Sequence, residues 1–543
     1  MGRTRSVYSG NLRHPCTWKH AFLWGHVRRM HGHAGKNNQY SACYRCWIFH
    51  LQIYRLSHGT QQVNMKTLWY NNSVLWILIL GLFCGINVFF LLGNVPVEAW
   101  DEARHGVSAY EMLVSHAWIV NTYRGEVDYW NLKPPLSFWT TIFSYKLFGI
   151  NSFGLRAASA FFGIATIGMT VAFAWRAFSR NVGILSGFFL VTAYSFVVTH
   201  NMRHGDPDSL YIFLTTGATF AVLLSAPRPR LLWLSAFLLS LAFLTKSFHV
   251  GAFGITLLSI AFAMHRFRLF SPRILVGCLA CGLLPVAVWA GLRYSHDGWD
   301  FLGKMFVVDV WNRATTIVEG HQQSASHYFS ILFNDFKYII KFCLCIFVLV
   351  IIFQYKKTIH FFIQRWKQGN IRLVVYLAIC SLIPFIIFQL SASKLKWYVY
   401  PIEPFIAILL AVMTHNLYIL IKDIQFFKYT LTIFICILCA CIVFQEIKIV
   451  KNNIRQARTT VFPQETLIGI EKEKQGRAVY LEGHDWRQDA VLAALFKGLQ
   501  PEDGGRAAWE KDESGYALLI SPNGDLWQQN QSEPLFKHDE LVH

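Results

Sequence analysis

Apolar segments long enough to cross a membrane recur along most of the 543-residue chain. A helix needs roughly 20 consecutive apolar residues to span the hydrocarbon core of a bilayer, and the run Val74–Leu92 is the first of this kind. The pattern predicts an all-α polytopic membrane protein with about eleven transmembrane helices. We place these helices at residues 73–92, 153–175, 182–200, 209–226, 231–246, 248–265, 274–293, 333–354, 371–391, 398–421 and 429–446.

One apolar segment is too short to span a bilayer. Leu136–Phe148 follows Pro134 and Pro135, and we predict that it forms a helix lying at the outer membrane interface. If it were counted as a span, the arginine-rich loops would lie outside the cell, against the usual charge bias. The distribution of charge therefore supports an interfacial helix.

Lysine and arginine are concentrated in alternate loops between the predicted spans. Cytoplasmic loops carry an excess of these residues, so we assign this set of loops to the cytoplasm. The set contains Arg176, Arg180, Arg228, Arg230, Arg266, Arg268, Arg273, Lys356, Lys357, Arg365, Lys367, Arg372, Lys422 and Lys428. The formal net charge of +19 is thus a topology signal, and it does not indicate a nucleic-acid partner.

The ends of the chain differ in composition from the apolar region, residues 65–446. Residues 1–64 contain nine Lys or Arg residues and no Asp or Glu. Met65 followed by Lys66 and an apolar run resembles a bacterial start with a signal anchor, so we interpret residues 1–64 as an upstream extension without a fold. A cytosolic or targeting domain is the alternative. Cys43 and Cys46 form a C-x-x-C pair, but no second pair follows at zinc-ligand spacing.

The C-terminal tail, residues 447–543, has mixed charge and little sustained apolarity. Ala478–Glu482 and Tyr516–Ile520 have the pattern of strands, and Arg487–Leu499 has that of an amphipathic helix. We predict a small α/β domain there. The charge-based topology places the tail on the periplasmic side.

Polar clusters lie where the chain leaves the apolar segments on the predicted outer side. They are WDEARHG at Trp100–Gly106, NLKPPLSFW at Asn131–Trp139 and RHGDPDS at Arg203–Ser209. Ionisable groups are costly inside hydrocarbon, so clusters at its edge are candidates for a functional site. We expect an enzyme that works at a membrane surface on a charged, lipid-linked substrate.

Each cluster also has a purely structural interpretation. Asp101 and Arg104 lie three residues apart on one face of a predicted helix, where the carboxylate could act as a base or simply cap the helix. Lys133 could bind a lipid phosphate or extend its charge to the interface from a helix end. Asp206 and Asp208, separated by Pro207, could face a polar cavity or lie in a solvated loop.

Further cations lie on the predicted outer side. Lys394 and Lys396 in SKLKWYVYPIEP, at Ser393–Pro404, depart from the charge bias and suggest an anionic partner. Arg313 and Glu319 are weaker candidates. Lys246, in LTKSFHVG, is explained equally well as a lysine whose ammonium reaches the interface.

The order of the motifs along the chain carries a resemblance. W-D-E-A-R, K-P-P, R-x-G-D-x-D, L-T-K and K-x-x-W-Y-x-x-P follow one another, and this order resembles the bacterial integral-membrane glycosyltransferases of the GT-C class. It is most similar to the family of the lipid A aminoarabinose transferases and the dolichyl-phosphate-mannose protein mannosyltransferases. The resemblance covers about residues 66–421 and is strongest over Trp100–Lys246.

This resemblance implies roles for individual residues. Asp101 matches the catalytic aspartate of the first outer loop, and Lys133 matches a phosphate-binding lysine. Asp208 best matches the aspartate of the second outer loop, with Asp206 as an extra acid, and these three aspartates are the catalytic candidates. His105 stands where tyrosine is more usual. The substrate-binding candidates are Glu102, Arg104, Lys133, Arg203, Lys394, Lys396 and Tyr398.

The function implied is an inverting glycosyltransferase of the bacterial inner membrane with a periplasmic active site. The donor would be a polyprenyl-phosphate-linked sugar, and the acceptor a lipid, a glycan or a protein. A hydroxyl acceptor would need Asp101 or Asp208 as a base, whereas for a phosphate acceptor the aspartates would hold the sugar. No cofactor motif occurs in the sequence, and a divalent metal ion is compatible with the carboxylates. The alternative is a transporter or flippase, which predicts charged residues near the bilayer midplane.

Overall fold

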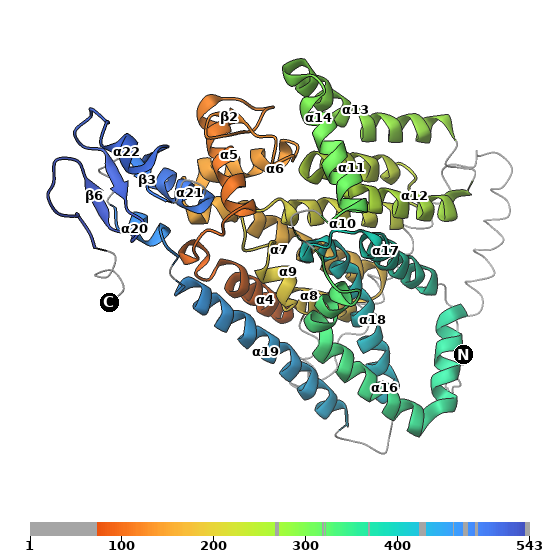
Figure 1. Ribbon diagram of the computed structural model, residues 1–543. Coiled ribbons are helices and arrows are strands. Elements are labelled where there is room, and N and C mark those ends of the chain that lie inside the picture. The colour runs from red at the N-terminus through yellow and green to blue at the C-terminus, as the bar shows by residue number, and fades with distance from the viewer. Residues whose placement is uncertain are drawn as a thin grey trace, which may run out of the picture. The chain divides into compact units, whose positions relative to one another are not determined.

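The structure is a computed structural model (Figure 1). It describes residues 73–266, 271–317, 320, 322–367, 370–422, 430–459, 461–470, 476–483 and 487–537. Residues 1–64, with their Cys43–Cys46 pair, and Glu319 lie outside this described part of the chain.

Helices make up the described chain as far as residue 457, apart from one short hairpin. The α-helices are α4 (Ser73–Cys84), α5 (Asp101–Ser115), α6 (Leu136–Phe148), α7 (Ser152–Ala177), α8 (Arg180–Val191), α9 (Tyr194–Val198), α10 (Asp208–Leu223), α11 (Leu231–Lys246), α12 (Gly251–His265), α13 (Pro272–Asp297), α14 (Asp300–Phe306), α15 (Arg313–Thr315), α16 (His327–Lys367), α17 (Asn370–Leu390), α18 (Glu403–Lys422) and α19 (Thr430–Ala457). The hairpin strands are β1 (Thr122–Tyr123) and β2 (Glu126–Val127), which pair antiparallel.

Seven helical stretches among the described residues are long and apolar enough to cross a bilayer. They are Ser73–Asn94, Ser152–Ala177, Leu231–His265, Pro272–Asp297, Ile371–Leu390, Lys396–Ile421 and Thr432–Ala457. Two shorter apolar helices, α8 and α10, lie at predicted spans. The predicted all-α polytopic class is confirmed, while the count of eleven spans stays a prediction. Two predicted spans form one stretch, because α11 and α12 are joined by a single 3-10 turn at Ser247–Val250.

The central helices α7, α8, α10 and α18 pack closely against one another. Gly183 allows α8 to approach α7, since a Cβ there would lie 2.7 Å from the carbonyl oxygen of Val171. Small residues at such contacts let helix backbones meet where apolar burial alone cannot drive association. Phe173 of α7 stacks on Phe220 of α10 with ring centroids 4.0 Å apart. These contacts fix the positions of the helix ends from which the connecting loops begin.

Helix α6 has the bounds that the sequence predicts for the short apolar segment. It packs between α5 and α7. Ser144 donates a hydrogen bond to the carbonyl oxygen of Gly154, and Tyr145 packs in a buried position against α5. Its location at the membrane interface stays a prediction.

The C-terminal part contains a small mixed sheet. Its strands are β3 (Ala478–Leu481), β4 (Gln500–Glu502), β5 (Leu518–Ile520) and β6 (Leu526–Gln528), in the order β4-β3-β5-β6. Strand β3 is parallel to β4 and β5, and β6 is antiparallel to β5. Short helices α20 (Gln464–Ile468), α21 (Gln488–Phe496) and α22 (Gly505–Trp509) accompany them. Strands β3 and β5 thus lie within the two segments predicted as strands, and α21 lies within the segment predicted as an amphipathic helix.

This C-terminal part shares a hydrophobic core with α5 and α6. Val479, Leu518 and Leu492 belong to the same buried cluster as Val107 of α5. A Cβ at Gly106 of α5 would lie 2.6 Å from Leu492, so glycine allows α21 to rest directly on α5. The division into domains at residue 446 stays a prediction. Side chains from both sides of that boundary belong to one buried cluster.

Candidate functional site

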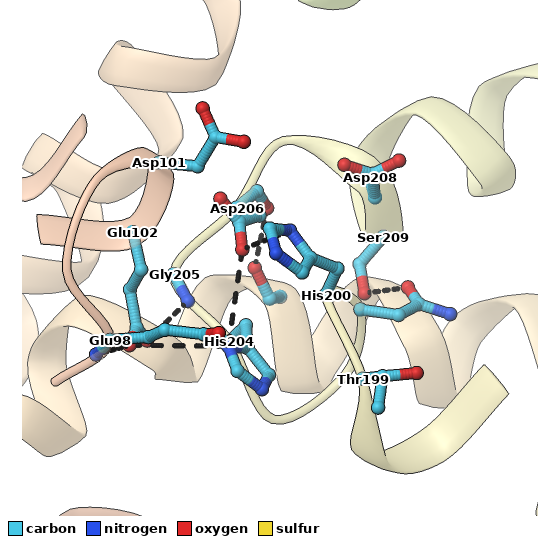
Figure 2. A network of polar contacts seen from close by, with 12 residues as sticks. Glu98, Asp101, Glu102, Thr199, His200, His204, Gly205, Asp206, Asp208 and Ser209 are labelled. Atoms are coloured by element: carbon cyan, nitrogen blue, oxygen red, sulfur yellow. Dashed lines mark hydrogen bonds and ion pairs between the residues drawn. The ribbon is translucent and has the colours of Figure 1, made fainter. Parts of the chain in front are cut away.

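Glu102 is buried at the second position of α5 and joins three parts of the chain. Its carboxylate accepts hydrogen bonds from Arg156 Nε at 2.6 Å and Nη2 at 2.8 Å, and from the backbone N–H of Gly205 at 2.8 Å. Burial raises the pKa of Glu102, but the Arg156 guanidinium more than offsets this effect and holds the pKa below its ordinary value. Glu102 therefore connects α5, α7 and the loop before α10. Figure 2 shows Glu102 beside Gly205 of that loop.

The Arg156 guanidinium extends this connection to the chain before α5. It donates to the carbonyl oxygens of Leu92, Val95 and Pro96 at 3.1, 2.7 and 2.9 Å. With both carboxylate oxygens of Glu102 engaged as well, the side chains of this ion pair are 0% and 1% exposed. Glu102, a predicted substrate-binding residue, is thus committed to holding the site together.

Asp101 and Lys133 form a looser pair at the edge of the site. Lys133 Nζ lies 3.6 Å from Asp101 Oδ1 and donates to Asn131 Oδ1 at 3.0 Å. The Lys133 side chain is 20% exposed and the Asp101 side chain is 33% exposed. Both groups are therefore accessible to a ligand. Two motifs that the sequence analysis singled out, W-D-E-A-R and K-P-P, therefore meet here.

Arg104 does not pair with Asp101, the partner that helical spacing suggests. It donates instead to Asp128 Oδ2 and Oδ1, both at 2.8 Å, and its guanidinium lies 4.2 Å from the ring centroid of Tyr123. Asp128 is buried, which raises its pKa, but the hydrogen bonds from Arg104 outweigh burial and lower the pKa overall. Asp128 is far along the chain from Arg104 and outside any recognised motif, so sequence reasoning missed it.

The loop between α9 and α10 brings two histidines to Asp206 (Figure 2). His200 Nδ1 lies 3.1 Å from Asp206 Oδ2, and His204 Nδ1 lies 3.3 Å from Glu98 Oε2. The two imidazole rings stack with centroids 5.6 Å apart. On its other side, His200 stacks on Trp397 at 3.7 Å. Neither histidine was a site candidate from the sequence, although His204 lies inside the R-x-G-D-x-D motif.

Asp208 begins α10 and forms an ion pair with Lys246 at the end of α11. Both side chains are buried. Lys246 Nζ lies 5.9 Å from the ring centroid of Tyr398, whose hydroxyl accepts a hydrogen bond from Arg313 Nη1 at 3.1 Å. Lys246, which the sequence explained equally well as a lysine reaching the interface, is therefore part of the same constellation. The L-T-K and K-x-x-W-Y motifs meet beside Asp208.

Arg313 also lies near a carboxylate that the sequence did not single out. Its Nε is 3.5 Å from Asp309 Oδ1, and Asp309 accepts a hydrogen bond from Ser247. Burial raises the pKa of Asp309. The segment Val307–Asn312 is a single π-helical turn, which directs Asp309 toward Ser247 and Lys246 at the end of α11.

The remaining predicted cations have different surroundings. Arg203 is 2% exposed and donates to the carbonyl oxygens of Asn87, Val88 and Phe90 at 3.1, 2.9 and 2.9 Å. It therefore caps the end of the first helix and offers no accessible surface to a substrate. Lys394 donates to the carbonyl oxygen of Ser391 at 3.1 Å, and Lys396 is exposed.

Unusual backbone conformations occur directly beside the charged groups. Trp100, His200 and Ser247 have φ values of 70°, 49° and 49°, although none of them is glycine. Trp100 precedes Asp101, His200 contacts Asp206, and Ser247 follows Lys246. Strained residues of this kind tend to cluster at functional sites, where the surrounding structure holds them in place. Five further residues that are not glycine have a positive φ elsewhere in the described chain, so these conformations do not identify the site by themselves.

The described residues contain no group of three or more histidine, cysteine or acidic side chains arranged to hold a metal ion. Most carboxylates of the site instead have a cationic partner from the protein itself. The arrangement can therefore bind a negatively charged group through Lys133, and it can accept or orient a hydroxyl through Asp101.

Comparisons with known proteins find similarity over parts of the chain. Residues 132–290 match the family model for dolichyl-phosphate-mannose-protein mannosyltransferase. Two curated relatives are named undecaprenyl phosphate-alpha-4-amino-4-deoxy-L-arabinose arabinosyl transferase. The one from Pseudomonas fluorescens (strain Pf0-1) is 24% identical over 59% of this chain and 55% of its own length. The one from Shewanella sediminis (strain HAW-EB3) is 26% identical over 60% and 58%. The chain thus spans little more than half the length of these relatives.

A solved structure has the same fold. The crystal structure of ArnT from Cupriavidus metallidurans bound to undecaprenyl phosphate matches 82% of this chain and 92% of its own, with a TM-score of 0.56 and 15% identity. At this identity the likeness concerns the fold alone. The predicted GT-C-like fold, and the resemblance to the aminoarabinose transferases and mannosyltransferases, are confirmed.

We expect Glu102→Gln to destabilise the protein strongly. The change removes the negative charge but little volume, and it leaves the buried Arg156 guanidinium without a counter-charge. Breaking a buried ion pair in this way costs about 3–5 kcal/mol. The thermal unfolding midpoint of the detergent-purified protein measures the effect, with Asp101→Asn as the control at the neighbouring, accessible carboxylate. Equal midpoints for Glu102→Gln and the wild type would contradict the structural role of Glu102.

Proposed function

We propose that this chain is an inverting glycosyltransferase that moves a sugar from a polyprenyl-phosphate donor to a lipid, glycan or protein acceptor. The observation that carries this proposal is the accessible Asp101–Lys133 pair, a carboxylate and an ammonium 3.6 Å apart beside apolar helices. The family match includes Lys133. The names of the two curated relatives, which specify transfer of a sugar from undecaprenyl phosphate, support the donor class.

The leaving group explains the need for a cation. When the bond between the sugar C1 and the phosphate oxygen breaks, a phosphodiester with one negative charge becomes a phosphomonoester with up to two. Groups placed in advance where charge develops stabilise a transition state more than the ground state. Lys133 would bind this phosphate, and its partial exposure leaves the ammonium available to do so.

The acceptor decides what Asp101 does. A hydroxyl that attacks C1 must lose a proton, and Asp101 is the accessible carboxylate that would take it. A single displacement of this kind inverts the configuration at C1. If the acceptor is a lipid phosphate, no proton needs to be removed, and Asp101 would hold the sugar hydroxyls. The charge bias of the loops supports a reaction on the outer face of the inner membrane.

With a hydroxyl acceptor, Asp101→Asn should reduce transfer strongly without loss of folding. Asparagine has nearly the same volume but cannot accept a proton, so the rate should fall by about 10²–10⁴-fold. Transfer from an undecaprenyl-phosphate-linked 4-amino-4-deoxy-L-arabinose in purified membranes measures the effect. Glu126→Gln, at an exposed carboxylate of the β1–β2 hairpin, is the matched control. Wild-type turnover by Asp101→Asn would exclude the proposed role.

Lys133→Ala should weaken donor binding more than acceptor binding. A hydrogen bond to a charged group contributes about 1.5–3 kcal/mol, which corresponds to a rise of roughly 10- to 100-fold in the donor KM. Steady-state kinetics with varied donor and fixed acceptor test this expectation. Lys146→Ala, at an exposed lysine of α6, is the control. An unchanged donor KM together with an unchanged kcat would remove Lys133 from the phosphate site.

Asp208→Asn should reduce transfer more than Asp206→Asn. Asp208 is the counter-charge of the buried Lys246 and lies where the family motif places its second aspartate. Removing it leaves an ammonium unpaired beside Tyr398. Comparing the two variants in one transfer assay, with protein levels matched, decides the order. The reverse order would show that Asp206 occupies the family position.

A further inference from the structure

His200 has the geometry of a working imidazole rather than a packing residue. Its Nδ1 lies 3.1 Å from Asp206 Oδ2, and the side chains are 16% and 1% exposed. A carboxylate paired with Nδ1 orients the imidazole ring. The opposite nitrogen, Nε2, remains as the atom that can act on a ligand.

The backbone and the neighbouring rings hold this imidazole in place. His200 has a φ of 49°, an unfavourable value for a residue with a side chain. Its ring is stacked at 3.7 Å on Trp397, which belongs to the K-x-x-W-Y motif, and at 5.6 Å on His204. The fold therefore keeps one histidine in a costly conformation between two motifs of the proposed site.

The charges facing His200 favour its protonated form. Asp206 and His204 face it from its own loop, and Asp101 and Glu98 from the segment around the start of α5. Burial lowers the pKa of His200, but the carboxylate of Asp206 more than offsets burial and raises the pKa to about 9. The surrounding carboxylates therefore favour the imidazolium form at neutral pH.

We propose that His200 is a further catalytic residue of this site, whose imidazolium, held by Asp206, donates through Nε2 to the phosphate oxygen that leaves the sugar. This inference rests on the proposed function and deepens it. Lys133 would bind the phosphate as a point charge, whereas His200 would supply a directed, charge-assisted hydrogen bond. The ligand class is a polyprenyl phosphomonoester, the form that the donor takes as it leaves.

The step balances in charge and protons. The bond between C1 and the phosphate oxygen breaks, and its electron pair stays on that oxygen, which accepts a hydrogen bond from Nε2. A new bond forms between C1 and the acceptor oxygen, whose proton passes to Asp101. The phosphomonoester leaves as a dianion, His200 keeps its proton, and Asp101 ends protonated. Loss of that proton from Asp101 to water resets the site.

Binding of undecaprenyl phosphate as a function of pH tests the assignment without knowledge of the sugar. The phosphomonoester loses its second proton near pH 6, so it is a dianion throughout the range from pH 7 to 10. The wild type should therefore bind it with an affinity that falls as the pH rises through about 9, where His200 loses its proton. Undecaprenol, which lacks the phosphate, should show no such change.

The first variant is His200→Asn, because asparagine adopts a positive φ more readily than other residues with side chains. It should weaken undecaprenyl phosphate binding at pH 7.5 by roughly 10-fold or more, as for a lost hydrogen bond to a charged group, and abolish the change near pH 9. His204→Asn is the matched control at the other imidazole, and it should keep that change. A His200→Asn variant with wild-type affinity and a wild-type pH profile would overturn the proposal.

The second variant keeps the histidine and removes its partner. Asp206→Asn should move the loss of affinity to a lower pH, because it removes the carboxylate that raises the pKa of His200 most. A transition that stays near pH 9 in this variant would also overturn the proposal. If the wild-type protein does not bind undecaprenyl phosphate at all, the proposed donor class itself fails, and this outcome is distinct from a failure of His200.

Discussion

The buried ion pair of Glu102 and Arg156 is the interaction on which the site depends. It brings together α5, α7, the segment before α5 and the loop before α10, through hydrogen bonds to side chains and to backbone. An ion pair out of water is stabilising only when its remaining hydrogen-bonding positions are filled. Here they are filled by the backbone groups of the loops that carry Asp101 and Asp206. Moving either loop would therefore break hydrogen bonds of the ion pair that also holds the other loop.

The charges around this anchor form successive pairs with different accessibility. Asp206 with His200 and Asp208 with Lys246 are largely enclosed, whereas Asp101 with Lys133 is partly exposed. Enclosed pairs fix geometry, because separating them would leave a buried charge unpaired. The accessible pair can exchange its internal contact for contacts with a ligand. Because Asp101 and Lys133 are the more exposed of these pairs, a charged lipid headgroup would bind beside them.

The C-terminal part contributes to the same edge by packing. Gln464 donates to the carbonyl oxygen of Val97 at 2.8 Å and accepts from its N–H at 3.0 Å, and it also donates to the buried Asp489 at 2.7 Å. Helix α21 lies against α5 at Gly106. The segment that leads into Asp101 is therefore held from the side of the helices by Arg156 and from the side of the sheet by Gln464.

The sequence by itself determined the membrane class, the bounds of α6 and the clusters from which the site is built. These features follow from local rules, since span length, proline positions and charge at the edge of hydrocarbon can be read from neighbouring residues. Asp101, Lys133 and Asp208 became candidates because they lie in these clusters. The tertiary structure decided the pairing: Arg104 binds Asp128 rather than serving Asp101, Arg203 caps a helix, and His200 joins Asp206. Such partners come from distant segments brought together by helix packing, and no spacing along the chain records which buried charge will neutralise which.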